Sequence, residues 1–461
     1  MLRRLTLSLG LLVVLAAMPA AAQQQIIVRT NPGVGLLGLQ NICLPLLCQV
    51  VRGLDGSQNQ LFLVQPSLLS DITSLLNGLL GAPGVAAAEP DQLLSMPLMP
   101  QYAVPNGLYQ TSRMQYYGAS TWAGFVQQPA MQIIRAQDAQ STFQVSGAGI
   151  VATIDTGVDP THPVLKPFLL SGYDFTRNTA GGSELPDATA CSATSSSSGL
   201  LGGLTSTLSS LLSSSTSSAC TTTSSASPAY VQQSTVAVVD QSTVAVVEGN
   251  GMSDFGHGTM VAGVIHLVAP TAKILPLKAF QSDGTGTLSN ILRAIYYAEQ
   301  NHANVINMSF EIKSYSPELA RALHSANNAG IICVAAAGND GKDELVYPAA
   351  LSGNVMGIAS TSDADTQSSF SNYGSDVVWI AAPGEDIVST YPFGTYAAES
   401  GTSFSTPFVS GAAALLFQLN PKIGQYGASQ ALAHAKWISP SMDHGRLDVY
   451  HALDAFVFGV N

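Results

Sequence analysis

The chain has 461 residues, which is enough for two or three domains and for a large hydrophobic core. Only 10% of its residues are charged, and its formal net charge is −12. This acidic balance excludes the extended basic surface that nucleic-acid binding requires, so no nucleic-acid partner is expected.

The N-terminus has the pattern of an export signal. Arg3 and Arg4 form a positive region, and the apolar run from Leu5 to Ala17 is too short to cross a bilayer comfortably. Small residues follow, so residues 1–22 are predicted to be a signal peptide cleaved before Gln23. An uncleaved membrane anchor is the alternative, but no stop-transfer pattern flanks the run. The protein is expected to be secreted or extracytoplasmic, without membrane contact after signal removal.

Export permits disulfides, and the chain has five cysteines. Cys43 and Cys48 are close enough in sequence to pair. Cys191 and Cys220 flank a Ser-rich stretch and would staple its base. Cys333 lies in an apolar strand and is expected to be a buried free thiol. Spacing alone leaves other pairings open.

Residues 23–115 are expected to form a small domain and a linker. The alternation of apolar residues predicts strands at 25–29 and 59–64, a helix at 68–80 and a closing strand, VAAAEPD, at 85–91. From about residue 96 to 128, Pro, Gly, Tyr and Gln are frequent without a clear period, which is typical of a linker and lead-in.

Residues 116–461 alternate between predicted strands and helices. The expected strands lie at 149–154, 273–280, 304–309, 330–336 and 355–359, and the expected helices at 258–269, 288–301, 317–328 and 402–419. This order predicts an α/β fold with a doubly wound, mostly parallel sheet and helices on both faces.

A Ser/Thr-rich insertion interrupts this pattern at about 180–230 and is expected to be a flexible surface loop. Directly after it, QSTVAVV at 233–239 recurs at 241–247. A β-hairpin and a duplication without a role of its own both remain open for this repeat.

Three polar residues lie in Gly- and Thr-rich segments: Asp155 in IDTGVD, His257 in DFGHGT and Ser403 in GTSFSTP. A serine hydroxyl becomes a nucleophile when an imidazole takes its proton and a carboxylate orients that imidazole. The order Asp, His, Ser is one of three unrelated orders in which this geometry occurs. Ser403 is expected at a helix N-terminus, where free N–H groups favour developing negative charge. Asp159 is a weaker alternative to Asp155 as the carboxylate. His257 could instead be an ordinary core histidine, and Ser403 could instead be a plain helix cap.

These segments resemble the catalytic motifs of the subtilisin-like serine proteases, the subtilase family. A fourth segment, AAAGND, resembles the one that supplies this family's oxyanion-hole asparagine, here Asn339, and a turn asparagine is the alternative. The resemblance runs from about Pro129 to the C-terminus. It implies a serine endopeptidase that hydrolyses polypeptide substrates through an acyl-enzyme intermediate. A triad hydrolase acting on esters and a non-catalytic binding protein on the same fold are the alternatives.

The resemblance extends to the N-terminal region. Residues 23–115 resemble the family's inhibitory propeptide, a small α+β domain, so the chain is expected to be a self-processing proenzyme with its own propeptide as a partner. An unrelated accessory domain is the alternative. The mature protein is expected to be a monomer.

Substrate-binding residues are implied in the same way. Gly284 and Gly286 in DGTGTL resemble the edge along which family substrates add a strand, and Ser309 and Gly338 resemble parts of the opposite wall. The family usually continues Ser-Leu-Gly after this serine, whereas this chain has Phe310 and Glu311, which leaves the side-chain pockets open.

Many subtilisins bind calcium through a carboxylate shortly after the catalytic Asp and through a loop inside the His helix. Here Val164 stands at the carboxylate position, and no loop interrupts the predicted helix. No metal and no cofactor are therefore expected, and a weaker calcium site elsewhere stays open.

Overall fold

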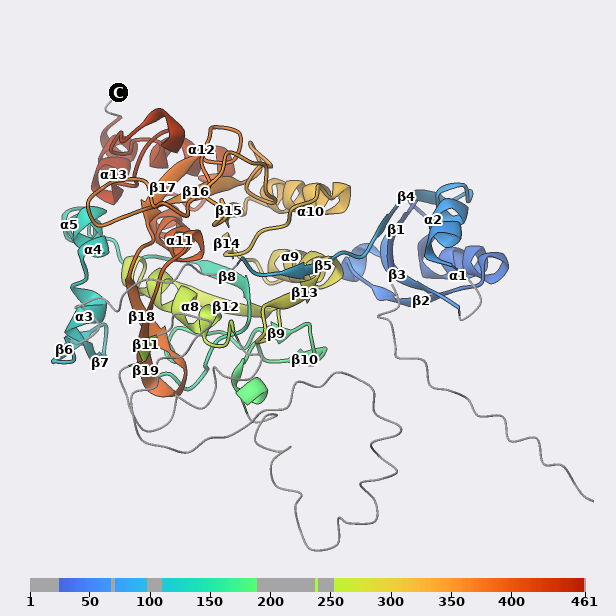
Figure 1. Ribbon diagram of the computed structural model, residues 1–461, viewed down its shortest axis with the longest axis horizontal. Helices are drawn as coiled ribbons and strands as arrows, with labels where there is room; N and C mark the ends of the chain where they lie inside the picture. Colours follow the sequence, from blue (N-terminus) through green and yellow to red (C-terminus); the bar gives the residue numbers. More distant parts are fainter. Residues whose placement is uncertain (1–24, 68–70, 98–109, 189–236, 239–252, 460–461) are drawn as a thin grey trace, which may run out of the picture.

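The computed structural model describes residues 25–67, 71–97, 110–188, 237–238 and 253–459 (Figure 1). The expected signal peptide, Cys191, Cys220 and most of the Ser/Thr-rich insertion lie outside these residues. So does the second copy of the repeat. From the first copy, Ala237 and Val238 form β11 (Ala237–Val238), which pairs antiparallel with β19 (Thr395–Glu399).

The N-terminal unit is a four-stranded antiparallel sheet with two helices, at the right of Figure 1. Its elements are β1 (Ile26–Thr30), α1 (Gly35–Leu46), β2 (Cys48–Gly53), β3 (Leu61–Pro66), α2 (Ile72–Leu80) and β4 (Val85–Pro90), with strand order β2-β3-β1-β4. Side chains alternate along β1, so that Ile26 and Val28 pack in this unit's own core. Ile27 points the other way, into a core shared with the rest of the protein.

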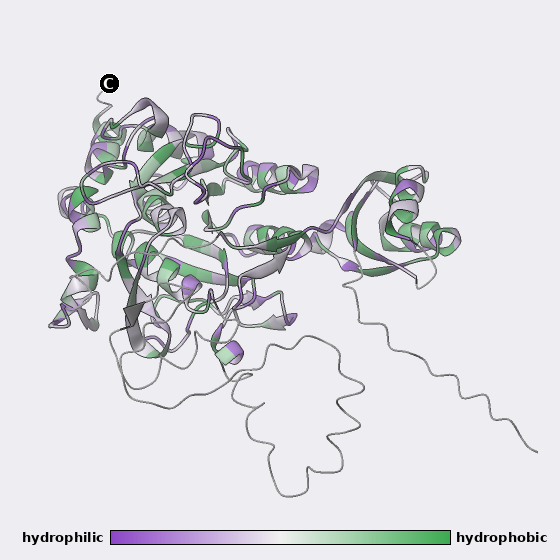
Figure 2. Cartoon of the chain, viewed as in Figure 1, coloured by the Kyte–Doolittle hydropathy of each residue, from purple (hydrophilic) through white to green (hydrophobic). Residues whose placement is uncertain are grey.

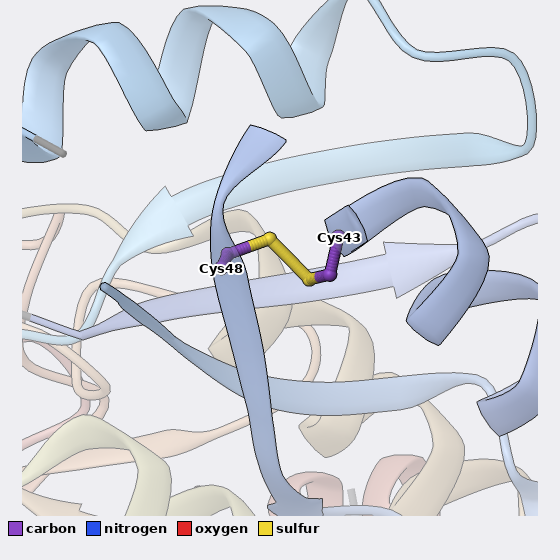
Figure 3. The surroundings of a disulfide bond; sticks show 2 residues. All are labelled: Cys43 and Cys48. Atoms are coloured by element: carbon purple, nitrogen blue, oxygen red, sulfur yellow. A yellow bond between two sulfur atoms is a disulfide. The ribbon is translucent and has the colours of Figure 1, made fainter. Parts of the chain in front are cut away.

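Helix α1 was not predicted from the sequence. It contains Gly38 and Pro45, which are poor helix formers, and it lacks a charged face that would have marked it. Its Cys43 is buried and forms a disulfide with Cys48 at the start of β2 (Figure 3). The bond fixes the end of the helix to the first residue of the strand. Cys333 is a buried free thiol, and burial raises its pKa to about 12.

An eight-stranded sheet forms the centre of the larger unit, in the order β10-β9-β12-β8-β14-β15-β16-β17. Its strands are β8 (Ile150–Asp155), β9 (Tyr173–Asp174), β10 (Thr179–Ala180), β12 (Lys273–Lys278), β14 (Val305–Met308), β15 (Ile332–Ala336), β16 (Met356–Thr361) and β17 (Ile380–Pro383). Every neighbouring pair is parallel except β10 and β9. The predicted α/β fold with a mostly parallel sheet is confirmed.

Helices cover both faces of this sheet. Helices α8 (His257–Val268) and α11 (Thr402–Leu419) pack in one core, and α9 (Leu288–Gln300) and α10 (Pro317–Asn328) in the other. Adjacent residues of β8 enter different cores: Val151 joins the first and Ala152 the second. Both faces of the strands are therefore buried, and Figure 2 colours most of the sheet as hydrophobic.

The remaining elements connect or flank these layers. They are β5 (Leu93–Ser95), β6 (Arg113–Tyr116), β7 (Ala119–Trp122), α3 (Ala123–Val126), α4 (Pro129–Ile133), α5 (Ala136–Phe143), β13 (Thr285–Thr287), β18 (Ile387–Tyr391), α12 (Gly424–Leu432), α13 (Val449–Phe458), and the 3₁₀ turns η1 (Gly56–Gln58), η3 (Pro392–Gly394) and η4 (Pro440–Met442).

The region expected to be a linker without regular structure contains, in its described part, the β6–β7 hairpin. Trp122 at its end stacks on Tyr396, with ring centroids 4.6 Å apart. The hairpin packs through contacts with a strand far away in the sequence. It therefore leaves no regular apolar pattern of its own from which it could be predicted. Within the part of the chain that the structure describes, no helix combines the length and apolar character that a membrane crossing requires.

Candidate active site

Three of the predicted site residues lie at one edge of the sheet. Asp155 is the last residue of β8, Ser309 directly follows β14, and Asn339 follows β15 in the next loop. These strands are parallel neighbours, so their carboxyl ends meet, and such an edge is where ligands bind in α/β sheets. His257 begins α8 and Ser403 lies in the first turn of α11. The ring of His257 lies 5.3 Å from that of Phe404, which brings the two helix starts together.

Asp155 and His257 form a buried pair. Nδ1 of His257 donates to Oδ1 of Asp155 over 2.8 Å, and the backbone N–H of Thr156 donates to the same oxygen over 2.7 Å. A glycine after the histidine permits this approach, because a Cβ on Gly258 would lie 2.1 Å from the carbonyl oxygen of Gly157. The small residue beside His257 thus lets β8 and the loop after it pack closely against the start of α8.

The charge of Asp155 controls the protonation of His257. Burial by itself lowers the pKa of His257, but the charge and hydrogen bond of Asp155 raise it, with smaller contributions from Glu399 and Asp254, to about 9. With Nδ1 held as the donor, Nε2 is the nitrogen that exchanges a proton. Among the described residues, Nε2 has no hydrogen-bond partner.

Ser403 makes a reciprocal pair of hydrogen bonds with Ser309. Its Oγ donates to the Ser309 carbonyl over 3.1 Å, and the Ser309 Oγ donates to the Ser403 carbonyl over 2.8 Å. The second bond replaces one that the helix lacks, because Pro407 has no N–H to donate to the carbonyl four residues back. The Ser403 hydroxyl therefore points toward β14, and it makes no hydrogen bond with Nε2 of His257.

Asn339 is anchored to the start of α11. Its Oδ1 accepts hydrogen bonds from the backbone N–H of Thr402 over 2.9 Å and from the Thr402 hydroxyl over 2.8 Å. These bonds hold the amide beside Ser403. Gly338 precedes it with a φ of +96°, in the left-handed region that favours glycine.

Thr402 and Glu184 are neighbours of the site that the sequence analysis missed. Glu184 is fully buried at the start of α8, where it accepts hydrogen bonds from the backbone of Gly256 over 2.7 Å and from the Thr259 hydroxyl. Burial raises its pKa to about 8. Composition had placed this residue in the insertion from about 180, yet Glu184 and Asp187 both pack against the body, and Asp187 accepts from buried Lys278. The only sequence signal that these two residues belong to the folded body was their negative charge among small polar residues.

The segment that follows the N-terminal unit, which includes β5, occupies the edge expected to bind substrate. Strands β5 and β13 lie side by side in Figure 1 and pair antiparallel. In this register Leu94 lies opposite Gly286. The N–H of Met96 donates to the carbonyl of Gly284 over 2.9 Å. Both glycines thus lie along an edge to which another chain segment adds a strand.

Two carboxylates just before β5, those of Glu89 and Asp91, each bind the start of a helix. Glu89 accepts from the backbone N–H of Glu318 over 3.0 Å, in the first turn of α10. Asp91 accepts from the backbone N–H of Ser289 over 2.8 Å, in the first turn of α9. Arg29 adds an ion pair to Glu318, with 2.7 Å between Nη2 and Oε2. Each carboxylate satisfies helix N–H groups that lack partners within the helix.

The His helix, α8, runs without interruption, as the sequence predicted. The described residues contain no group of three or more His, Cys, Asp or Glu side chains able to hold a metal ion.

The fold and the site define a protein of the subtilase family, and the chain belongs to it: residues 147–456 match the profile of Peptidase_S8, the Subtilase family. The resemblance drawn from the four motifs is thereby confirmed.

Individual relatives cover different shares of the chain. Subtilisin BL of Lederbergia lenta is 41% identical over 175 residues, which are 36% of this chain and 64% of that protein. Thermitase of Thermoactinomyces vulgaris is 44% identical over 171 residues, 35% of this chain and 61% of that protein. The thermophilic serine proteinase of Bacillus sp. (strain AK1) is 30% identical over 358 residues, 76% of this chain and 67% of that protein. The match thus spans under two thirds of the length of the first two relatives.

Among solved structures, a cold adapted subtilisin-like serine proteinase matches with a TM-score of 0.47 and 27% identity, over 66% of this chain and 89% of that one.

Proposed function

We propose that this protein is a secreted serine endopeptidase that hydrolyses polypeptides through an acyl-enzyme intermediate. The observation that carries the proposal is the 2.8 Å hydrogen bond between His257 and Asp155, beside a serine in the first turn of α11. Membership of the subtilase family supports the same reaction class.

In the first half of the reaction, Oγ of Ser403 attacks the carbonyl carbon of the scissile bond, and Nε2 of His257 takes the hydroxyl proton. Asp155 stays ionised, keeps Nδ1–H in place and stabilises the imidazolium that forms. The carbonyl oxygen becomes an oxyanion. The backbone N–H of Ser403, at the N-terminus of α11, and the side-chain amide of Asn339 are the donors proposed for it.

In the second half, the tetrahedral intermediate collapses. His257 gives its proton to the nitrogen of the departing amine, so the peptide bond breaks and an ester to Ser403 remains. His257 then takes a proton from water, the resulting hydroxide attacks the ester carbonyl, and the proton returns to Oγ of Ser403. None of these proposed reaction steps uses a redox reaction or a cofactor.

The N-terminal unit is proposed to be an inhibitory propeptide. Its β5 pairs with β13 along the proposed substrate edge, while Glu89 and Asp91 bind the starts of two helices. A strand in this place excludes substrate. Residues 1–22 are proposed to direct export, and the mature enzyme is proposed to be a monomer.

Reagents that acylate or phosphonylate activated serines are expected to label Ser403 and to stop hydrolysis of casein, because only an activated hydroxyl reacts with them. Chelators are expected to leave the initial rate unchanged. Peptide mapping of the labelled enzyme, with casein and ester assays in parallel, checks both points. Hydrolysis that a chelator abolishes while Ser403 remains unlabelled would contradict the proposal, and ester turnover without casein turnover would favour an esterase.

Replacing Asn339 with alanine is expected to lower kcat by about 10²–10³-fold with little change in KM, because the amide acts on charge that develops in the transition state. Steady-state kinetics on one peptide substrate measures the two constants separately. An effect confined to KM would make Asn339 a substrate-binding or turn residue instead.

A further inference from the structure

A cleft of about 370 Å³ lies between three segments of the chain. One wall is residues 311–314 and a second is Asn339 with Asp340, while residues 92–97, which include β5, line it from a third side. In the proposed reaction the scissile carbonyl lies at Asn339. The cleft is thus placed to receive the side chain of the substrate residue that contributes this carbonyl, the residue before the scissile bond.

Charged side chains surround this cleft. Glu311 and Asp340 line it, and so does Lys313, whose ammonium group contacts Glu311, Asp340 and Glu344. Three carboxylates against one ammonium group leave a net negative charge. The wall that carries Glu311 is fixed, because Ile312 exchanges two backbone hydrogen bonds with Tyr347, over 2.6 and 2.8 Å.

Glu311 has one carboxylate oxygen engaged and one without a partner. Oε1 lies 2.7 Å from Nζ of Lys313, whereas Oε2 accepts no hydrogen bond from any described residue. The residue is only 7% exposed. Its Oε2 lies against Gly338, where it would be 2.0 Å from a Cβ, so the carboxylate reaches across to the residue next to Asn339. Oε2 thus faces Gly338 and the side-chain amide of Asn372, and Oε1 is the oxygen that faces Lys313.

We infer that Glu311 makes this endopeptidase select substrates with a basic side chain, lysine or arginine, immediately before the scissile bond. The side chain enters the cleft beside Asn339, and its ammonium or guanidinium group competes with Lys313 for the Glu311 carboxylate. The inference rests on the proposed function. It makes the replacement of the family's glycine by Glu311 the determinant of specificity. Self-processing is not bound by this preference, because an intramolecular cut replaces affinity with effective concentration.

The test compares two peptide substrates that differ only before the scissile bond, one with lysine and one with norleucine, which has the same chain length without the ammonium group. The exported, self-processed enzyme is used. We expect kcat/KM to be about tenfold or more higher for lysine, the size of a charge-assisted hydrogen bond. In Glu311→Gln this ratio is expected to fall to near one. A purely structural loss would lower both rates together and keep the ratio.

Two further variants test whether the preference for lysine depends on the charges around Glu311. Lys313→Gln removes the competing cation and is expected to raise the lysine-to-norleucine ratio. Glu344→Gln removes a carboxylate that contacts Lys313 but does not line the cleft, and it is expected to keep the preference.

A ratio near one in the wild-type enzyme, or a ratio unchanged in Glu311→Gln, overturns the inference. If norleucine peptides are hydrolysed and Ser403 is labelled, the proposed function stands even though the inference about Glu311 fails. If neither peptide is hydrolysed and Ser403 is not labelled, the proposed function fails and the inference fails with it.

Discussion

Ser403→Ala is expected to abolish peptide hydrolysis, by about 10⁶-fold in kcat, and to accumulate as a precursor that keeps residues 23 to about 110. The nucleophile is missing, so the chain cannot cut the segment that lies beside its own cleft. Gel mass and N-terminal sequence of the exported variant measure the result. Normal maturation in a host lacking other proteases would assign the cut to another enzyme or show that the N-terminal unit is no propeptide.

The variant should retain its fold. Ser403 is fully buried, and its hydroxyl donates one hydrogen bond, to the Ser309 carbonyl. Losing that bond costs about 1 kcal/mol, which a domain of this size tolerates. Ser405→Ala is the matched control, because Ser405 is a buried serine of the same helix whose hydroxyl has no partner among the described residues. It is expected to mature normally.

Asp155→Asn is expected to lower kcat by about 10⁴-fold, because an amide no longer holds the imidazole in the tautomer that leaves Nε2 free to accept a proton. It also removes the main influence that raises the pKa of His257. In the wild-type enzyme, His257 acts as a base only when neutral. Its kcat/KM should therefore rise with pH, about tenfold per unit below the pKa, and level off near pH 9.

In Asp155→Asn the residual activity should level off at a lower pH. Profiles of kcat/KM between about pH 6 and 10 measure this shift. Asp254→Asn is the control: this carboxylate contributes less to the raised pKa of His257 and forms no hydrogen bond with it, so the shift should be smaller. An unchanged profile in Asp155→Asn would mean that another group titrates.

The sequence predicted the architecture of the site well where local signals exist. The range of α10 was predicted correctly, since Ser316 caps it and Pro317 occupies its first position. The positions of Asp155 and Asn339 followed from strand ends in a parallel sheet. What could not be predicted depends on contacts between distant residues. The hydroxyl of Ser403 turns toward a carbonyl 94 positions away, and Glu184 binds a helix start 72 positions away. Nothing local to either residue encodes its partner.

The hydrogen bond that Ser309 donates to the Ser403 carbonyl has a dynamic consequence. The ends of a helix normally fray first, since part of their backbone has no partner within the helix. Here the first turn of α11 is tied to the end of β14, so the backbone of the nucleophile moves with the most buried layer of the protein. The first turn of α11, which in an ordinary helix would be mobile, thus holds the backbone of Ser403 in a fixed position.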